Sequence, residues 1–343
     1  MQTPRISCQP LLTEHLLCEG LFQSEPLCLV DVGASGGIDQ YWNVFGTQLR
    51  AFGFDPLLKE VERLNSIRHA GDQKFFAYLV GYRRYDELFP PQIRNDRQMV
   101  PDTQPFPRTS AVRATTASQC DYVRTYYDQT GAGLYATETI ELDEFFLETH
   151  PSDVDFIKID TDGSDYQALL GAQQLIQSKP VLGVAIECQF HGLVHDDANT
   201  FSNIDRLLRR LGFSLFDLEV YRYSRAVLPR PFVYRIPAQT VAGQVLWADA
   251  LYLRDAGQPD YEATWKTPLT ERKILKLVAL SEIFGVEDCA AELMMKYRDR
   301  LTPLIDVGRC LDLITPRLRG EKLSYQRYNE MFDKHPERFF PPS

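Results

Sequence analysis

Apolar runs alternate with amphipathic segments along residues 27–255. Each run is short and bounded by Gly, Pro or Asp, which is the pattern of a buried strand. Between the runs, apolar residues recur at helical spacing, as in residues 56–69 and 201–211. This alternation predicts an α/β fold with a mostly parallel sheet covered on both faces. Strands are expected at residues 27–30, 49–54, 74–80, 154–159, 181–187, 213–223 and 245–253, with a short strand entering a helix over 139–146.

Three stretches lie outside this alternation. Residues 1–26 carry leucines at helical intervals and are expected to form a helical lead-in. Residues 256–343 have helical periodicity over 269–297 and 304–313, which predicts a C-terminal helical appendage. Residues 83–137 are poorly periodic and rich in Pro, Arg and Tyr. Because so long a loop inside a compact domain is usually functional or disordered, we interpret this stretch as a substrate-facing insert, with disorder as the alternative.

The segment DVGASGG at residues 31–37 predicts a ligand site. It follows the apolar run 27–30 and precedes residues 38–42, which can open a helix. About twenty residues later, the second apolar run ends at Asp55. Strand, glycine turn, helix, strand and acid in this order are typical of a βαβ nucleotide site. The alternative is an ordinary turn between a strand and a helix.

The details of the turn favour one nucleotide over others. Gly33, Gly36 and Gly37 do not have the G-x-G-x-x-G spacing of a dinucleotide site, which disfavours a nicotinamide-dependent oxidoreductase. Asp31 would repel a pyrophosphate but suits the cationic amino-acid end of S-adenosylmethionine (SAM). Asp55 is expected to hold the ribose hydroxyls. The predicted cofactor-binding residues are Asp31, Gly33, Ala34, Ser35, Gly37, Phe54, Asp55, Pro56, Gly81 and Asp160.

Acidic residues after the strand at 154–159 are candidates for catalysis. Asp160, Asp162 and Asp165 could include a general base for an acceptor hydroxyl or a carboxylate pair for a divalent metal. Asp165 and Asp162 have a structural alternative, since either could cap the following helix. His191 follows the next strand and is either an acid/base or a structural histidine. We take Asp160, His191 and Asp162 as the catalytic candidates and expect no metal site.

Two other features are open to a structural interpretation. Lys158 should share a face with Asp160, and a salt bridge would explain it. Tyr and Arg residues gather at 108–127 and 221–230, where they could stack on sugar rings and pair with phosphate or carboxylate, or simply be solvated.

Composition narrows the class of protein. The 343 residues are 44% hydrophobic, so a substantial core is expected. A formal net charge of -10 argues against nucleic-acid binding. The seven Cys form no C-x-x-C motif, which predicts reduced thiols and makes a zinc site improbable. With no signal-peptide pattern and no long apolar run, we expect a cytoplasmic protein without stable membrane insertion.

Several blocks together resemble the FkbM-type family of class I SAM-dependent methyltransferases. They are VDVGA at 30–34, FDP at 54–56, residues 139–146, DFIKID at 155–160, and Asp162-Gly163 followed by LLGA at 169–172. The resemblance covers roughly residues 27–255. It departs from the family pattern at Asp162, where the family usually has Glu before Gly.

The resemblance implies a Rossmann-like sheet of seven strands with the last strand antiparallel. It also implies SAM as the donor and O-methylation of a hydroxyl on a sugar, glycan or sugar-containing metabolite. The alternative is a methyltransferase-like binding module without catalysis. Residues 256–343 have no counterpart in the resemblance and could mediate a homo-oligomer.

Overall fold

The computed structural model describes residues 6–7, 9–83, 138–150, 152–161, 163–190, 198–223, 240–265 and 268–340. The chain divides into two compact units: Leu27–Asp255, and Arg5–Pro26 together with Ala256–Ser343. We call these the α/β unit and the helical unit. Apart from Arg83, the predicted insert at 83–137 lies outside the described residues.

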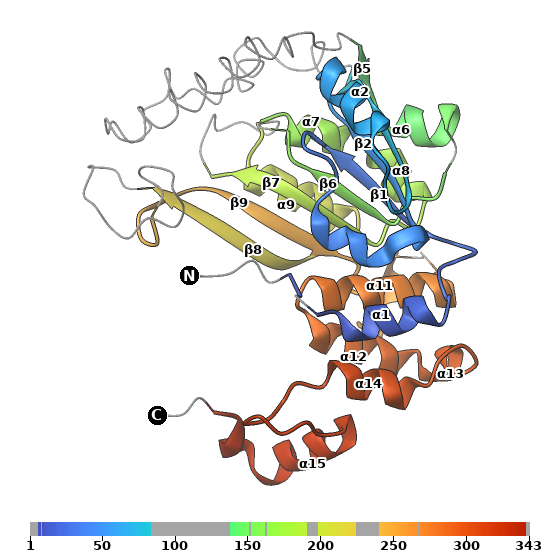
Figure 1. Ribbon diagram of the computed structural model, residues 1–343. Helices are drawn as coiled ribbons and strands as arrows, with labels where there is room; N and C mark the ends of the chain where they lie inside the picture. Colours follow the sequence, from blue (N-terminus) through green and yellow to red (C-terminus); the bar gives the residue numbers. More distant parts are fainter. Residues whose placement is uncertain are drawn as a thin grey trace. The chain divides into compact units, whose positions relative to one another are not determined.

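The α/β unit contains a seven-stranded sheet in the order β3-β2-β1-β6-β7-β9-β8 within the described residues (Figure 1). β9 is antiparallel to both of its neighbours, and the pairs among β3, β2, β1, β6 and β7 are parallel. The predicted fold class is therefore confirmed. The strands are β1 Leu27–Val32, β2 Leu49–Phe54, β3 Asp72–Phe76, β6 Phe156–Ile159, β7 Gly183–Gln189, β8 Ser214–Tyr223 and β9 Gln244–Leu253.

The predicted strand at 74–80 is divided in the structure. Its first part belongs to β3, and its last two residues form β4 (Leu79–Val80). β4 leaves the main sheet to pair with β5 (Thr139–Ile140) in a separate parallel ladder. The apolar run alone could not show this change of partner, because both parts keep the composition of a strand.

One face of the main sheet carries a continuous apolar core. Alternate residues of β1, β6 and β7, such as Val30, Ile157 and Val184, pack on helices α7 to α9. The intervening residues face the other side, where the register aligns Asp31 with Lys158. The carboxyl ends of the strands are therefore polar on one face only. The helices of this unit are α2 Leu58–Ser66, α6 Leu142–Glu144, α7 Asp165–Leu170, α8 Gln173–Ser178 and α9 Phe201–Arg210, with the π-helical turn η4 Phe145–Thr149.

The helix expected after the glycine turn is a 3-10 segment, η1 (Gln40–Gln48). Gly46 interrupts it with φ 50° and ψ −125°. Trp42 and Phe45 are buried, and the Trp42 ring lies 5.2 Å from the ring of Phe156 on β6. Burial of these two rings, rather than an amphipathic stripe, holds the segment against the sheet.

The helical unit joins the two ends of the chain. Glu282 on α11 accepts hydrogen bonds from the backbone N–H groups of Leu12 and Thr13 on α1, and from the Thr13 hydroxyl. Lys276, also on α11, is 1% exposed and donates to Glu25. The lead-in and the appendage thus form one unit. Its helices are α1 Leu11–Cys18, α10 Tyr261–Trp265, α11 Glu271–Ile283, α12 Glu287–Lys296, α13 Arg298–Leu301, α14 Val307–Ile314 and α15 Tyr325–Lys334, with η5 Pro336–Phe339.

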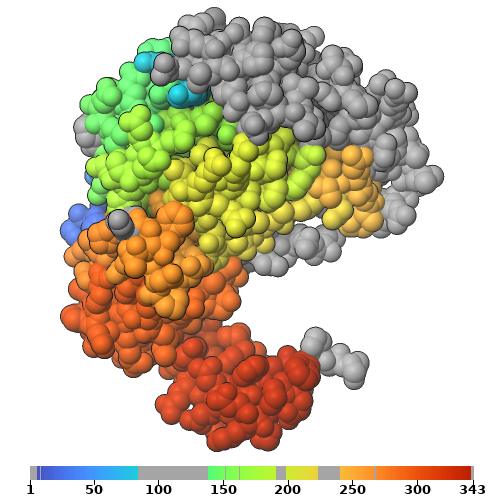
Figure 2. Space-filling model, turned by 180° about the vertical axis from the view of Figure 1, so that it is seen from behind, coloured from blue at the N-terminus to red at the C-terminus, as the bar shows by residue number. Residues whose placement is uncertain are grey.

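Local sequence signals fix the ends of these helices. Thr270, Asp306 and Ser324 cap α11, α14 and α15, each accepting from a backbone N–H three residues on. Figure 2 shows the C-terminal segment around α15 in red, where Leu318, Leu323 and Met331 form a small core of their own. None of the helices in the described ranges has the length and apolar composition needed to cross a bilayer.

We expect Arg254 to stabilise the α/β unit. It is 4% exposed, donates to the backbone carbonyls of Val181, Leu211 and Ile176, and lies 4.0 Å from the Phe213 ring centre. Arg254→Met should lower the free energy of unfolding by about 2–4 kcal/mol, because it leaves buried carbonyls without donors.

The matched control is Arg50→Met, which removes an exposed ion pair with Asp72 (3.4 Å). This change should cost less than about 1 kcal/mol. Chemical denaturation of the full chain followed by circular dichroism measures both. Equal effects of the two variants would contradict the expectation.

Candidate active site

The glycine turn brings the ends of β1 and β6 into direct contact. Gly33 has φ 89°, and a Cβ built on it would lie 1.8 Å from the carbonyl oxygen of Asp160. The N–H groups of Gly33 and Ala34 both donate to the carbonyl of Phe54 at the end of β2. Three strand ends are therefore held together through backbone atoms, and only a residue without a side chain fits at position 33.

Asp31 lies at the end of β1 with no exposed surface. Its Oδ1 is 3.3 Å from Lys158 Nζ, while its Oδ2 is buried without a hydrogen-bond partner among the described residues. Burial raises the pKa of Asp31 to about 6, and the neighbouring Lys158 partly opposes this rise. The site therefore contains a carboxylate oxygen that is ready to accept a hydrogen bond from a cation.

Lys158 on β6 lies among three carboxylates. Its Nζ is 3.3 Å from Asp31, 3.8 Å from Asp160 and 3.9 Å from Asp39. Burial acts to lower the pKa of Lys158, but the three carboxylates together raise it. The salt bridge between Lys158 and Asp160 that we considered from their alternation is present, and it belongs to a larger network.

Asp55 lies at the end of β2 and is 5% exposed. Its Oδ1 accepts from the N–H of Leu57 at 2.8 Å, and the N–H of Ser35 in the glycine turn also donates to this carboxylate. Burial raises the pKa of Asp55 to about 6. Asp55 thus links the turn to the start of α2; its contact with a ribose stays a prediction.

The other predicted cofactor-binding residues have different environments. Ala34 packs with Val61 and Leu64, and the Phe54 ring packs against Phe76, so these two side chains belong to the core. Only the backbone groups of Ala34 and Phe54 are therefore candidates for contact with a ligand. Gly81 donates its N–H to Ile140 on β5. Ser35 is exposed, and Gly37 and Pro56 are half-buried.

The acids after β6 have separate roles in the structure. The Asp160 side chain is 45% exposed. Asp165 is fully buried and accepts from the backbone and hydroxyl of Thr161, the N–H of Gly163 and the side chain of Asn199. Asp165 therefore organises the loop before α7. It does not cap the helix as its structural alternative predicted, because α7 begins at Asp165 and has no side-chain cap hydrogen bond. Asp162 and His191 lie outside the described residues, so their catalytic roles stay predictions.

Asp249 on β9 was absent from our sequence candidates. The sheet register places it opposite Glu187 on β7 and Glu219 on β8. The Tyr221 hydroxyl donates to Asp249 at 2.9 Å, and burial with neighbouring acids raises the pKa of Asp249 to about 6. An acid within a predicted apolar strand was a visible signal, but its neighbours depend on the strand order.

The residues around Asp249 form a polar and aromatic group across three strands. We call this group the acidic strip: Glu187, Asp249, Glu219, Tyr221 and Trp247. The ring centres of Tyr221 and Trp247 are 5.8 Å apart.

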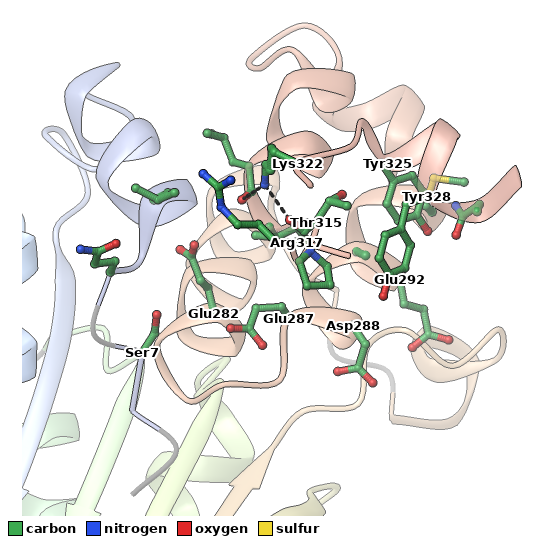
Figure 3. Close-up of a pocket in the computed structure, with 18 residues that line it drawn as sticks. Ser7, Glu282, Glu287, Asp288, Glu292, Thr315, Arg317, Lys322, Tyr325 and Tyr328 are labelled. Atoms are coloured by element: carbon green, nitrogen blue, oxygen red, sulfur yellow. Dashed lines mark hydrogen bonds between the residues drawn. The ribbon is translucent and has the colours of Figure 1, made fainter. Parts of the chain in front are cut away.

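A cavity of about 960 Å³ lies in the helical unit (Figure 3). Several of its charged groups maintain the fold: Glu282 binds the start of α1, and Lys322 donates to the carbonyls of Leu313 and Thr315. No strand end reaches this cavity, so we place the candidate active site in the α/β unit. Within the described ranges, no group of three or more His, Cys, Asp or Glu side chains is arranged to hold a metal ion.

The strand order, the antiparallel β9 and the glycine turn after β1 define a Rossmann-like methyltransferase sheet. The family model described as the methyltransferase FkbM domain matches residues 31–215. The chain therefore belongs to the FkbM methyltransferase family, and S-adenosyl-L-methionine is its methyl donor. The family and the cofactor expected from the sequence are confirmed.

Two of the solved structures similar to the chain are methyltransferases of low sequence identity to it. One, from Aquifex aeolicus, is 9% identical, with 72% of this chain and 94% of that chain covered and a TM-score of 0.27. Another, the magnesium protoporphyrin IX methyltransferase from Synechocystis with bound SAM, is 12% identical, with 69% and 76% covered and a TM-score of 0.25. No curated protein matches the chain.

Two glycines of the turn provide a matched test of the contact between β1 and β6. Gly33 and Gly36 have nearly the same φ, 89° and 87°, but a Cβ on Gly36 would meet no atom within 4 Å. Gly33→Ala should lower the free energy of unfolding by roughly 3 kcal/mol or more, because backbone overlap adds to left-handed strain. Gly36→Ala should cost roughly 1–2 kcal/mol, from the strain alone.

Thermal unfolding of both variants measures this difference, and titration with SAM shows whether the donor site survives. Equal destabilisation would mean that the contact with Asp160 does not constrain residue 33.

Proposed function

We propose that this methyltransferase transfers the methyl group of SAM to a hydroxyl of a sugar, glycan or sugar-containing metabolite. The observation that carries the proposal is the acidic strip beside Asp160, at the carboxyl ends of β7 and β8 and the facing part of the antiparallel β9. Carboxylates accept hydrogen bonds from hydroxyl groups, and aromatic rings such as Tyr221 and Trp247 pack against sugar rings. Ligands of open α/β sheets bind at these strand ends.

The residues at the ends of β1 and β2 fit the donor. The unpartnered Oδ2 of Asp31 suits the ammonium group of SAM, and Asp55 lies at the strand end where ribose hydroxyls are expected. The open space beside Gly36 allows a ligand to approach the turn. When bound, SAM supplies a methyl group that its sulfonium already activates. The protein's main task is therefore to align donor and acceptor.

Asp160 is our first candidate for the general base. Its carboxylate is partly exposed, and it adjoins both Lys158 and the acidic strip. A sugar hydroxyl is a poor nucleophile at neutral pH, and a positioned base typically contributes about 10²–10⁴-fold in rate. Asp162 and His191 stay as the other candidates. A cytoplasmic location, the absence of nucleic-acid partners and self-association through the helical unit also stay predictions.

Ionisation of Asp31 should control the binding of SAM at acid pH. Because the pKa of Asp31 is raised to about 6, a cationic ligand must displace its proton below that pH. SAM affinity should be nearly constant from about pH 8 to about pH 7 and should fall below about pH 6, approaching 10-fold per pH unit for one carboxylate.

Asp31→Asn should bind SAM more weakly at neutral pH, with a shallower fall at acid pH, because Asp55 still titrates near the same value. Isothermal titration calorimetry across this range measures both effects. An unchanged affinity and pH profile in the variant would remove Asp31 from the donor site.

Substitution of Asp160 should separate catalysis from donor binding. Asp160→Asn should retain SAM binding within a few-fold and reduce turnover by about 10²-fold or more. The control is Asp153→Asn, which affects only an exposed carboxylate 3.5 Å from Lys179. The assay follows labelled methyl transfer from SAM to nucleotide sugars and oligosaccharides.

Resistance of the product to mild alkaline hydrolysis would identify a methyl ether rather than a methyl ester. Label found only in alkali-labile or nitrogen-linked products would contradict hydroxyl methylation. SAM binding without transfer to any acceptor of this class would favour the alternative of a binding module.

A further inference from the structure

We propose that Lys158 is a positioning residue of the methyl-donor site: its ammonium holds Asp31 charged and oriented so that one carboxylate oxygen stays free for the cationic end of SAM. The inference rests on the proposed donor site at the end of β1. It goes further in assigning a role to a residue that touches neither the donor nor the acceptor in that proposal.

The first step is the asymmetry of the Asp31 carboxylate. Lys158 lies 3.3 Å from Oδ1, and Oδ2 has no hydrogen-bond partner among the described residues although Asp31 has no exposed surface. An ionised carboxylate in such a place is costly unless a cation lies beside it. Lys158 supplies that cation at one oxygen and leaves the other available to a ligand.

The second step is the restraint on Lys158 itself. A lysine side chain is flexible and could move to either oxygen of Asp31. The same ammonium group also pairs with the carboxylates of Asp160, at 3.8 Å, and Asp39, at 3.9 Å. These two ion pairs oppose the movement. The direction in which Lys158 points is therefore fixed by three carboxylates. They come from the end of β1, the turn after it and the end of β6.

The third step is the charge of the whole group. Three carboxylates surround one ammonium, so the described cluster of Asp31, Asp39, Asp160 and Lys158 keeps an excess of negative charge. Tyr41 on η1, Asp165 at the start of α7 and Asp249 on β9 are titratable groups that also interact with members of this cluster. This excess suits a ligand that carries a sulfonium and an ammonium, and it disfavours an anionic ligand.

The test is Lys158→Met, with Lys158→Arg as the conservative variant. Loss of the ammonium should raise the pKa of Asp31 further, so that Asp31 becomes mostly protonated near neutral pH. Relative to the native protein, SAM affinity should fall about 10-fold or more at pH 7 and recover most of that loss by about pH 8.5. Lys158→Arg should retain most of the affinity, because it keeps the charge.

A double-mutant cycle shows whether Lys158 acts through Asp31. In the Asp31→Asn background, Lys158→Met should change SAM affinity by less than about 3-fold, since the group it serves is already neutral. Lys179→Met is the control for removing a lysine from an ion pair elsewhere in the unit, 3.5 Å from Asp153, and it should leave affinity unchanged.

Two results would overturn the proposal. One is a loss of affinity that is independent of pH and additive with Asp31→Asn, which would indicate a purely structural lysine. The other is an unchanged pKa of Asp31 in Lys158→Met, measured in the ligand-free protein by NMR of the labelled carboxyl carbon. The NMR measurement does not depend on SAM binding or turnover, so it separates this inference from the proposed function.

Discussion

The structure of the candidate site depends on one close approach between backbone segments. The carbonyl of Asp160 occupies the space where residue 33 would carry a side chain, so the ends of β1 and β6 can meet only at a glycine with positive φ. This contact places Asp31 and Lys158 side by side and puts Asp160 next to both. The same turn donates two N–H groups to the end of β2, which carries Asp55. The geometry of the candidate site and the packing of the sheet therefore have a common origin.

The electrostatics of the site oppose the stability of the fold. Burial raises the pKa of Asp31 and of Asp55 to about 6, above the value of an unfolded chain. The carboxyl groups of Asp31 and Asp55 therefore bind protons more tightly in the folded protein than in the unfolded chain. Protonation of these groups stabilises the fold, and this stabilisation is lost as pH rises through about 6. At neutral pH the site holds ionised carboxylates at a cost. A cation bound beside these carboxylates would reduce this cost, and a donor held there would therefore stabilise the fold.

Much of the fold could be predicted because local patterns determine it. The apolar runs of β1 and β6 indicate two buried strands, and the order of acid and glycine in residues 31–37 indicates the turn that follows β1. The sequence did not show why Gly33 is required, because its neighbour Asp160 is distant along the chain. Asp249 was missed for the same reason: its role follows from pairing with Glu187 across the sheet. The neighbours of a residue on adjacent strands depend on the order of the strands in the sheet. The hydrophobic periodicity of a single segment does not determine that order.

Joining the two chain ends in one unit has a consequence for biosynthesis. The start of α1 is capped by Glu282, about 270 residues later in the chain. Ribosomes make proteins from the amino terminus, and domains generally fold in the order in which they emerge. The strands of the α/β unit are complete before α11 is made, whereas α1 must wait for its capping carboxylate. Helix α1 thus belongs to a unit that closes only after the α/β unit has been made, and a truncation that removes α11 would leave the start of α1 without its capping carboxylate.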